Sequence, residues 1–244
     1  MNEQPERIPD LRVALREVYA FEFTPRVRSD IADPAHVSIV HIERSIALLS
    51  KELQGELLDV GCGQKPYAGY FRHAKQLRSC DHHAVRSDLD FVCPADAIPL
   101  PDASLDGIVS TEMLEHVPDP RAVWVEFARL LKPAGKVLLS TPMYWPHHEA
   151  PYDFFRYTAY GLQRLAADAG FELLKIYPRG GTWAFVAQVI QHTIPHYLRF
   201  RWQRSLVNRL LLRIDRWRCD TRITTGWTIL AQKRTGSGGA SPGE

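Results

Sequence analysis

The stretch LLDVGCGQKPY (Leu57–Tyr67) decides the fold that the sequence predicts. It opens with a short apolar run, typical of a buried strand, and Gly61 and Gly63 follow that run at once. In doubly wound sheets a ligand binds where the first strand turns into the first helix, and glycines there let the backbone approach it closely. Asp59 stands two residues before the first glycine. A carboxylate at that position suits a cationic or amine-bearing ligand better than a diphosphate.

The residues after the two glycines do not match the dinucleotide-binding fingerprint. That fingerprint, G-x-G-x-x-G, places a pyrophosphate on a helix N-terminus. Here Gln64, Lys65 and Pro66 follow Gly63, so the third glycine is missing. An oxidoreductase with a nucleotide cofactor is therefore the disfavoured alternative.

The composition is that of an ordinary globular protein. The chain has 244 residues, of which 45% are hydrophobic and 24% are charged, which is enough for one large core. No apolar run reaches the length of about 18 residues that a spanning helix needs, and the polar start is unlike a signal peptide. The four cysteines show no disulfide framework. We expect a cytoplasmic protein.

Strand-like and helix-like segments alternate, which predicts an α/β sheet with helices on both faces. The strand candidates are ELLDV, QLRSCD, DFVC, LDGIVST, KVLLSTP, FELLKIY and GWTILAQK. Two helices are well marked. In residues 119–135, Asp119 is the expected N-cap, and Pro133 and Gly135 bring the end; in residues 158–170, Thr158 is the cap.

The chain divides into a main domain with smaller appendages. Residues 1–50 predict a helical N-terminal extension, and residues 51–234 form the main domain. Within it, residues 184–222 predict a basic helical insertion before the last strand. Residues 235–244 have the composition of a disordered tail.

The first motif resembles that of the class I S-adenosylmethionine-dependent methyltransferases, and the similarity covers roughly residues 50–180. Asp81, closing the second strand candidate, fits the acid that in this family binds both ribose hydroxyls. Asp96 fits the acid that contacts the adenine amino group, with Ala97 lining the base, and Glu112 is a further cofactor contact. STEMLEHVPDP and LLKPAGKVLLSTP resemble the family's fourth strand, following helix and fifth strand. Pro66-Tyr67 in place of a third glycine resembles a subgroup variant.

The resemblance implies a Rossmann-like, seven-stranded sheet with an antiparallel last strand inside it. The implied cofactor is S-adenosylmethionine, and the implied reaction is methyl transfer to oxygen or nitrogen of a small or medium metabolite, such as a sugar, polyketide-like or lipid-linked acceptor. Alignment of donor and acceptor supplies most of the catalysis, so no fixed catalytic set is required. The other alternative is a non-catalytic cofactor-binding subunit.

The loop TPMYWPHHEAPYDFFRYT (residues 141–158) is the expected acceptor side, since long loops rich in polar and aromatic residues are often functional. His148 is the first candidate for a general base, because imidazole titrates near neutrality. The expected substrate-binding residues around it are His147, Glu149, Asp153 and Arg156. The alternative is that the aromatic residues fill the core while the charges face water.

We expect no metal site. Cys80, His82, His83 and Cys93 match no standard zinc spacing. His116 is expected to shape the loop after the fourth strand.

The segment Ala184–Arg222 is strongly basic. It holds eight arginines and two aspartates, a net charge of +6 in a chain whose total is +2. Tryptophans and leucines lie between the arginines, a pattern typical of helices that rest on an anionic membrane or lipid-linked substrate. Nucleic acid is a disfavoured partner, and the remaining alternative is a helix whose apolar face covers the sheet. The oligomeric state stays open.

Overall fold

The computed structural model describes residues 7–27, 29–193 and 198–235, and its centre is a seven-stranded sheet. The strand order is β3-β2-β1-β4-β5-β7-β6, and β7 is antiparallel to both of its neighbours. The strands are β1 (Glu56–Val60), β2 (Gln76–Asp81), β3 (Phe91–Val92), β4 (Leu105–Thr111), β5 (Leu131–Pro142), β6 (Phe171–Pro178) and β7 (Gly226–Lys233). The predicted fold class and the antiparallel strand inside the sheet are confirmed.

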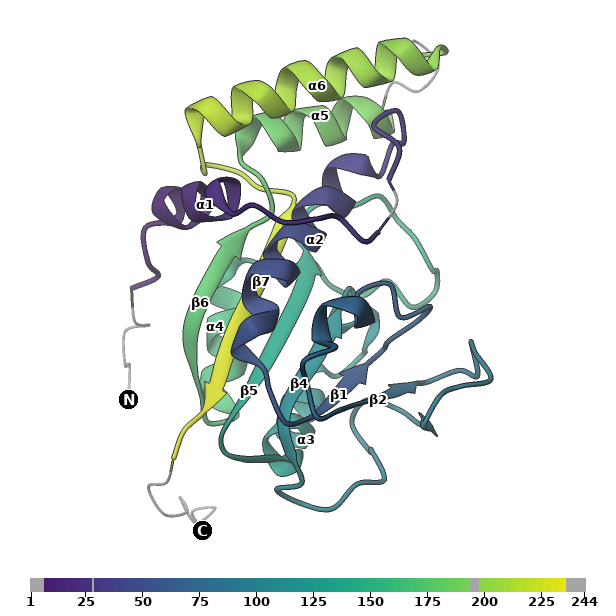
Figure 1. The fold of residues 1–244 in the computed structure, drawn as a ribbon, viewed down its shortest axis with the longest axis vertical. Helices are drawn as coiled ribbons and strands as arrows, with labels where there is room; N and C mark the ends of the chain where they lie inside the picture. The colour runs from purple at the N-terminus through teal and green to yellow at the C-terminus, as the bar shows by residue number, and fades with distance from the viewer. Residues whose placement is uncertain (1–6, 28, 194–197, 236–244) are drawn as a thin grey trace.

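Helices cover both faces of this sheet (Figure 1). The helices are α1 (Leu11–Ala20), α2 (His36–Leu49), α3 (Pro120–Leu130), α4 (Ala159–Asp168), α5 (Thr182–Thr193) and α6 (Arg201–Arg218), with short 3-10 turns η1 (Ser50–Glu52), η2 (Ala68–Phe71) and η3 (Leu114–His116). α3 and α4 pack on one face, whereas α1 and α2 pack on the other. None of the helices in the described ranges combines the length and the apolarity needed to cross a membrane.

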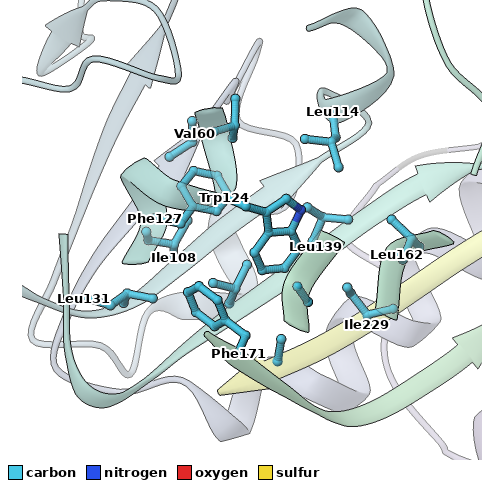
Figure 2. Close-up of a cluster of buried hydrophobic side chains, with 14 of the residues drawn as sticks. Val60, Ile108, Leu114, Trp124, Phe127, Leu131, Leu139, Leu162, Phe171 and Ile229 are labelled. Atoms are coloured by element: carbon cyan, nitrogen blue, oxygen red, sulfur yellow. The ribbon is translucent and has the colours of Figure 1, made fainter. Parts of the chain in front are cut away.

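The face under α3 and α4 carries the larger apolar cluster (Figure 2). Asp119 starts α3 as predicted, since its side chain accepts two backbone N–H groups of the first turn. The helix then buries Trp124 and Phe127 against the sheet. Trp124 meets Phe171 of β6 edge to face, with 5.1 Å between ring centroids. This packing joins α3 to the sheet as far as β6.

The opposite face is covered by the N-terminal helices. Ile42, Ile46 and Leu49 of α2 pack on Val109 of β4 and Leu138 of β5. The predicted helical N-terminal segment is therefore one of the layers of the core. Its separation from the main domain at residue 50 stays a prediction.

α5 and α6 form a helical pair beyond the edge at which β6 ends (Figure 1). Asp215 of α6 is fully buried and accepts backbone N–H groups from Gly181, Trp183 and Ala184 at 2.8–3.1 Å. Its other contact is the hydroxyl of Tyr19 in α1. The acid thus holds α6 against the start of α5 and against the N-terminal layer.

Two sequence expectations differ from the structure in detail. The helix expected to end near Pro133 and Gly135 ends at Leu130, because Leu131 already pairs with Leu105 as the first residue of β5. The predicted tail at residues 235–244 lies, apart from Thr235, outside the described residues.

Candidate functional site

The turn after β1 has the backbone geometry that its glycines predict. Gly61 and Gly63 have φ of +68° and +48°, in the left-handed region that other residues avoid. The N–H groups of Gly61 and Cys62 both donate to the carbonyl of Cys80 in β2. A Cβ added to Gly61 would lie 2.3 Å from Cγ of Met113, so this position has no room for a side chain. The turn therefore folds tightly across the ends of β1 and β2.

Asp81 lies directly beside this turn. The parallel register pairs Val60 with Cys80, so the next residue of each strand meets at the edge of the sheet. The N–H of Gly63 donates to Oδ2 of Asp81 at 2.9 Å, and the N–H of His83 lies 3.3 Å from Oδ1. The structure thus brings the predicted cofactor residues Gly61, Gly63 and Asp81 together at one turn, and their binding role stays a prediction.

Asp59 is buried under the same turn. Its side chain is only 6% exposed, and among the described residues its Oδ1 has no hydrogen-bond partner. Burial, which penalises the charged form, raises the pKa of this carboxyl to about 7; the nearby ammonium of Lys65 opposes that rise. A buried carboxyl with an unsatisfied oxygen is suited to pair with a cationic ligand.

Asp96 and Ala97 lie in the loop after β3, and both are exposed. This loop leaves from the Asp81 end of β2, since the N–H of Cys93 donates to the carbonyl of Asp81 at 3.0 Å. The adjoining Ile98 is buried, and its N–H is held by Glu126 of α3. The two exposed residues are free to meet a ligand, and their adenine contacts stay a prediction.

Glu112 follows β4 and has a partner that sequence reasoning missed. Its Oε1 lies 2.6 Å from Nη1 of Arg179 and 2.7 Å from Oγ of Ser140. Arg179 is fully buried at the end of β6, with its guanidinium against the backbone of Gly226, where a Cβ would lie 2.2 Å from Nη2. Glu112 therefore contacts residues that follow or belong to two other strands, Arg179 after β6 and Ser140 in β5. The sequence signal for Arg179 was available: it is a charged residue between the end of a strand and a pair of glycines, as Asp59 is a charged residue near the end of a strand that two glycines follow.

The loop at residues 141–158 closes over η3. Two successive N–H groups of the loop donate to the carbonyl of Glu115 at 3.0 and 3.2 Å. The hydroxyl of Tyr157 donates to the carbonyl of Leu114, and the ring of His116 lies 2.8 Å from the carbonyl of Tyr152 through Nδ1. Hydrogen bonds therefore hold the segment after β4 and the segment after β5 together.

The aromatic residues of this loop are divided between core and surface. Tyr157 is buried, whereas Phe154 and Phe155 are exposed. Of these three aromatic residues, only Tyr157 fills the core, as the alternative interpretation of the loop expects. The two phenylalanines are free to contact an apolar acceptor.

His148 lies beside the carboxylate of Asp153. Its backbone N–H lies 3.3 Å from Oδ2 of Asp153, and its ring Nδ1 is 3.6 Å from the same oxygen. Arg156 grips that carboxylate with both terminal nitrogens, at 2.6 and 2.9 Å. These hydrogen bonds hold the pKa of Asp153 well below its ordinary value. Arg156 therefore already has an anionic partner, so in this structure it positions Asp153.

The other two predicted substrate-binding residues are more exposed. The side chain of His147 is 99% exposed, with Nδ1 3.5 Å from Oδ2 of Asp153. Glu149 points its Oε2 to within 3.8 Å of Nε2 of His116. Their contacts with an acceptor stay a prediction.

Glu115 is the second residue that sequence reasoning missed. Its side chain is fully buried, and Oε1 has no hydrogen-bond partner in the part of the chain that the structure describes. Burial, with the charge of Glu112 as the second cause, raises the pKa of this carboxyl to about 8. The pattern Glu112-x-x-Glu115-His116 was the available signal, since it brings two acids and an imidazole to the end of one strand.

Comparison with known proteins agrees with this geometry. A methyltransferase-domain family matches residues 39–176, more than half of the chain. The ubiquinone biosynthesis O-methyltransferase of Idiomarina loihiensis is 36% identical over 104 residues, covering 35% of this chain and 42% of that protein. The 24-methylenesterol C-methyltransferase 2 of Oryza sativa subsp. japonica is 30% identical over 210 residues, covering 70% of this chain and 55% of that protein. The chain thus spans about half the length of these relatives.

Among solved structures, the [4+2]-cyclase SpnF is similar with a TM-score of 0.56 and 19% identity, covering 95% of this chain and 99% of that one. At this level of identity the likeness shows the fold alone. The fold does not define the reaction, which depends on the residues at the edge of the sheet.

Proposed function

The chain belongs to the S-adenosylmethionine-dependent methyltransferase family, and we propose that it transfers a methyl group from this cofactor to an oxygen or nitrogen atom of a small or medium acceptor. The observation that carries the proposal is the pairing of Asp81 with the glycine turn above the buried Asp59.

The residues at this turn fit S-adenosylmethionine. Asp81 offers carboxylate lone pairs beside the turn, where hydroxyls of the ribose would donate to them. The free Oδ1 of Asp59 would accept from the amino group of the methionine part. When bound, the cofactor supplies a methyl group activated by the positive sulfur. What the chain must add is alignment, exclusion of water and, for a hydroxyl acceptor, removal of a proton.

On the acceptor side, we assign proton removal to His148. A histidine that acts as a general base needs a ring nitrogen with a free lone pair and a fixed orientation. Nδ1 of His148 lies 3.2 Å from the carbonyl of Pro146, which can only accept, so Nδ1 carries the hydrogen and Nε2 keeps its lone pair. Asp153, itself held by Arg156, lies 3.6 Å from Nδ1 and helps to orient the ring.

We further propose that the acceptor is lipid-linked and that α6 rests on an anionic membrane surface. The exposed face of α6 presents four large apolar side chains to solvent: Trp202 at 63%, Leu206 at 58%, Leu210 at 54% and Trp217 at 76% exposure. Such rings and chains suit the headgroup region of a bilayer.

The charge of the same face selects an anionic surface. Within the described residues no salt bridge involves Arg209, Arg213 or Arg216, and the one acid of α6, Asp215, points inward. A second copy of this helix would be repelled by the same arginines. Nucleic acid would use the arginines but would leave the leucines and tryptophans without a function.

The test of the main proposal is formation of S-adenosylhomocysteine from S-adenosylmethionine, with pooled polar metabolites and pooled lipid extracts as separate acceptor sources. The expected result is turnover with at least one pool. Tight cofactor binding without turnover in either pool would support the non-catalytic binding subunit. Turnover only with polar metabolites would overturn the lipid-linked acceptor while leaving methyl transfer intact.

A further inference from the structure

Glu115, His116 and His148 form a cluster that sequence analysis did not predict. Among the described residues, this is the only group of three or more potential metal ligands whose ligating atoms all lie within 4.8 Å of one another. Glu115 and His116 come from η3, and His148 comes from the loop that closes over it. The rings of His116 and His148 meet edge to face with 4.6 Å between centroids.

Hydrogen bonding fixes which nitrogen of His116 faces the cluster. Its Nδ1 lies 2.8 Å from the carbonyl oxygen of Tyr152, which can only accept, so Nδ1 carries the hydrogen. Nε2 then keeps its lone pair in the neutral ring. That lone pair faces two carboxylate oxygens, Oε1 of Glu115 and Oε2 of Glu149, each at 3.8 Å. When the Glu115 carboxyl is ionised, these acceptors face one another and favour a cation between them.

His148 is oriented in the same manner. Its Nδ1 lies 3.2 Å from the carbonyl of Pro146, with Asp153 behind it, so its Nε2 is also a free lone pair. Metal-binding histidines in proteins typically donate their second nitrogen to a carbonyl or carboxylate, which fixes the tautomer and the ring. Both imidazoles of the cluster have such a partner without any ion in place.

The buried acid is the independent observation that points to a ligand. The side chain of Glu115 is fully buried, and its Oε1, the oxygen directed at His116, has no hydrogen bond among the described residues. The N···O separation of 3.8 Å is too long for a hydrogen bond. Ligand atoms at about 2.1 Å from one ion lie roughly 3.0–3.4 Å from each other. The Glu115–His116 pair, at 3.8 Å, would contract by about 0.4 Å, and the ligand atom of His148, within 4.8 Å of the other two, would move by up to about 1.4 Å to close the site.

From this geometry we infer that Glu115, His116 and His148 bind a divalent transition-metal cation, with Glu149 as a fourth, exchangeable ligand. Two imidazoles and a carboxylate favour zinc, manganese or iron(II) over magnesium and calcium, which prefer oxygen ligands throughout. Glu149, on the exposed side of the cluster, is the ligand that an incoming acceptor would displace.

The role of the cation in the reaction rests on the proposed function. A cation at this position would bind the acceptor oxygen and lower its pKa, so that the hydroxyl would lose its proton to solvent water rather than to a protein base. Nε2 of His148 cannot bind a cation and accept a proton at once. The cation-bound protein therefore uses His148 as a ligand, and the metal-free protein uses it as the base.

The experiment measures metal binding alone, on the full chain without an affinity tag and without cofactor or acceptor. Zinc, manganese and magnesium chlorides are titrated separately by calorimetry or chelator competition. We expect one equivalent of zinc or manganese to bind, with magnesium at least tenfold weaker. His116→Ala and His148→Ala should each weaken binding about 100-fold or more, since loss of even an outer partner of a ligand typically costs 10–100-fold.

Two further variants keep the result interpretable. Glu115→Gln preserves shape and should also lose metal affinity, and each variant is checked for native circular dichroism. His147→Ala is the matched control, because that histidine is the sequence neighbour of His148 but is 99% exposed and outside the cluster. Absence of stoichiometric binding in the wild type, or equal losses in His147→Ala and His148→Ala, would overturn the site. Because no methyl transfer is measured, this outcome is independent of the proposed function.

Discussion

The cofactor turn and the acceptor loop lie at the same edge of the sheet but are built in different ways. At the cofactor turn, Gly63 follows β1 and Asp81 ends the neighbouring β2, and the register of β1 on β2 brings them together. In the acceptor loop, His148 and its neighbours from η3 come from segments about thirty residues apart in sequence, and loop-to-turn hydrogen bonds hold them together. Strand register is thus sufficient to place a cofactor residue, whereas an acceptor residue depends on how a long loop closes.

This difference predicts that substitutions in the two regions affect different quantities. Variants of the acceptor loop should lower turnover at unchanged cofactor affinity, whereas variants of the cofactor turn should lower affinity. The following predictions test that separation.

The largest expected effect is on turnover in His148→Ala. Whether the imidazole acts as base or as metal ligand, its loss removes the activation of the acceptor, and turnover should fall roughly 100-fold. Steady-state rates with a working acceptor provide the measurement. Cofactor affinity in the same variant is the control and should stay within about twofold; a large loss of that affinity would break the separation of the two regions.

The next effect is on cofactor affinity in Asp81→Ala. We expect a loss of about 2 kcal/mol, or roughly 30-fold in Kd, because charge-assisted hydrogen bonds to both ribose hydroxyls disappear. Calorimetric titration with S-adenosylmethionine provides the measurement. Unchanged affinity in a folded Asp81→Ala protein would contradict the assignment.

A smaller effect is expected from pH. The pKa of Asp59 is raised to about 7 in the folded protein, so its acid form contributes stability at low pH that is lost as the pH rises through 7. A cationic ligand needs the ionised form, so its binding is coupled to loss of that proton. Cofactor affinity should therefore rise about 15-fold between pH 5.5 and pH 7.

The control for this pH dependence is Asp59→Asn, which is nearly isosteric and cannot titrate. Its affinity should be weaker at pH 7 and nearly flat over the same range. An equally steep rise in Asp59→Asn would assign the pH dependence to another group.

The smallest effect concerns the face of α6. Each arginine near an anionic bilayer contributes on the order of 1 kcal/mol, so Arg213→Gln should lower partitioning onto anionic vesicles about fivefold at low salt. Co-sedimentation with anionic and zwitterionic vesicles provides the measurement, and binding should weaken as ionic strength rises.

Arg164→Gln is the control for this surface, because Arg164 is also an exposed arginine but lies on α4, where it pairs with Asp168. It should leave partitioning unchanged. Equal, negligible binding to both vesicle types in the wild type would mean that the arginines of α6 merely face water.

The contrast between the cofactor turn and the acceptor loop also explains which features could be predicted from the sequence. Asp59 and the glycine turn were predicted from the pattern at the end of the first strand, whereas Asp81 was assigned from the family resemblance; the structure places Asp81 beside the turn through the N–H of Gly63. The seven-stranded order depended on family resemblance, since pattern alone does not say where β7 inserts. The early end of α3 was missed because pairing of Leu131 with β4 outweighs the local signals from Pro133 and Gly135.

The partners in the acceptor region were less accessible to sequence reasoning. Arg179 and Glu115 are fully buried, and burial of a charged residue reverses the ordinary expectation that charges face water. Arg156 was expected among the substrate-binding residues, and in the structure Asp153, three residues away, occupies both of its terminal nitrogens. Such pairings depend on loop closure, which no periodicity in the sequence specifies.

The central claim is that the turn after β1 binds S-adenosylmethionine, and titration of the wild-type chain with S-adenosylmethionine and, in parallel, with NAD tests it most directly. The account predicts single-site binding of S-adenosylmethionine and no measurable binding of NAD, because the turn lacks the third glycine and places the buried Asp59 where a diphosphate would lie. Comparable binding of NAD, or no binding of S-adenosylmethionine by the folded chain, would contradict it.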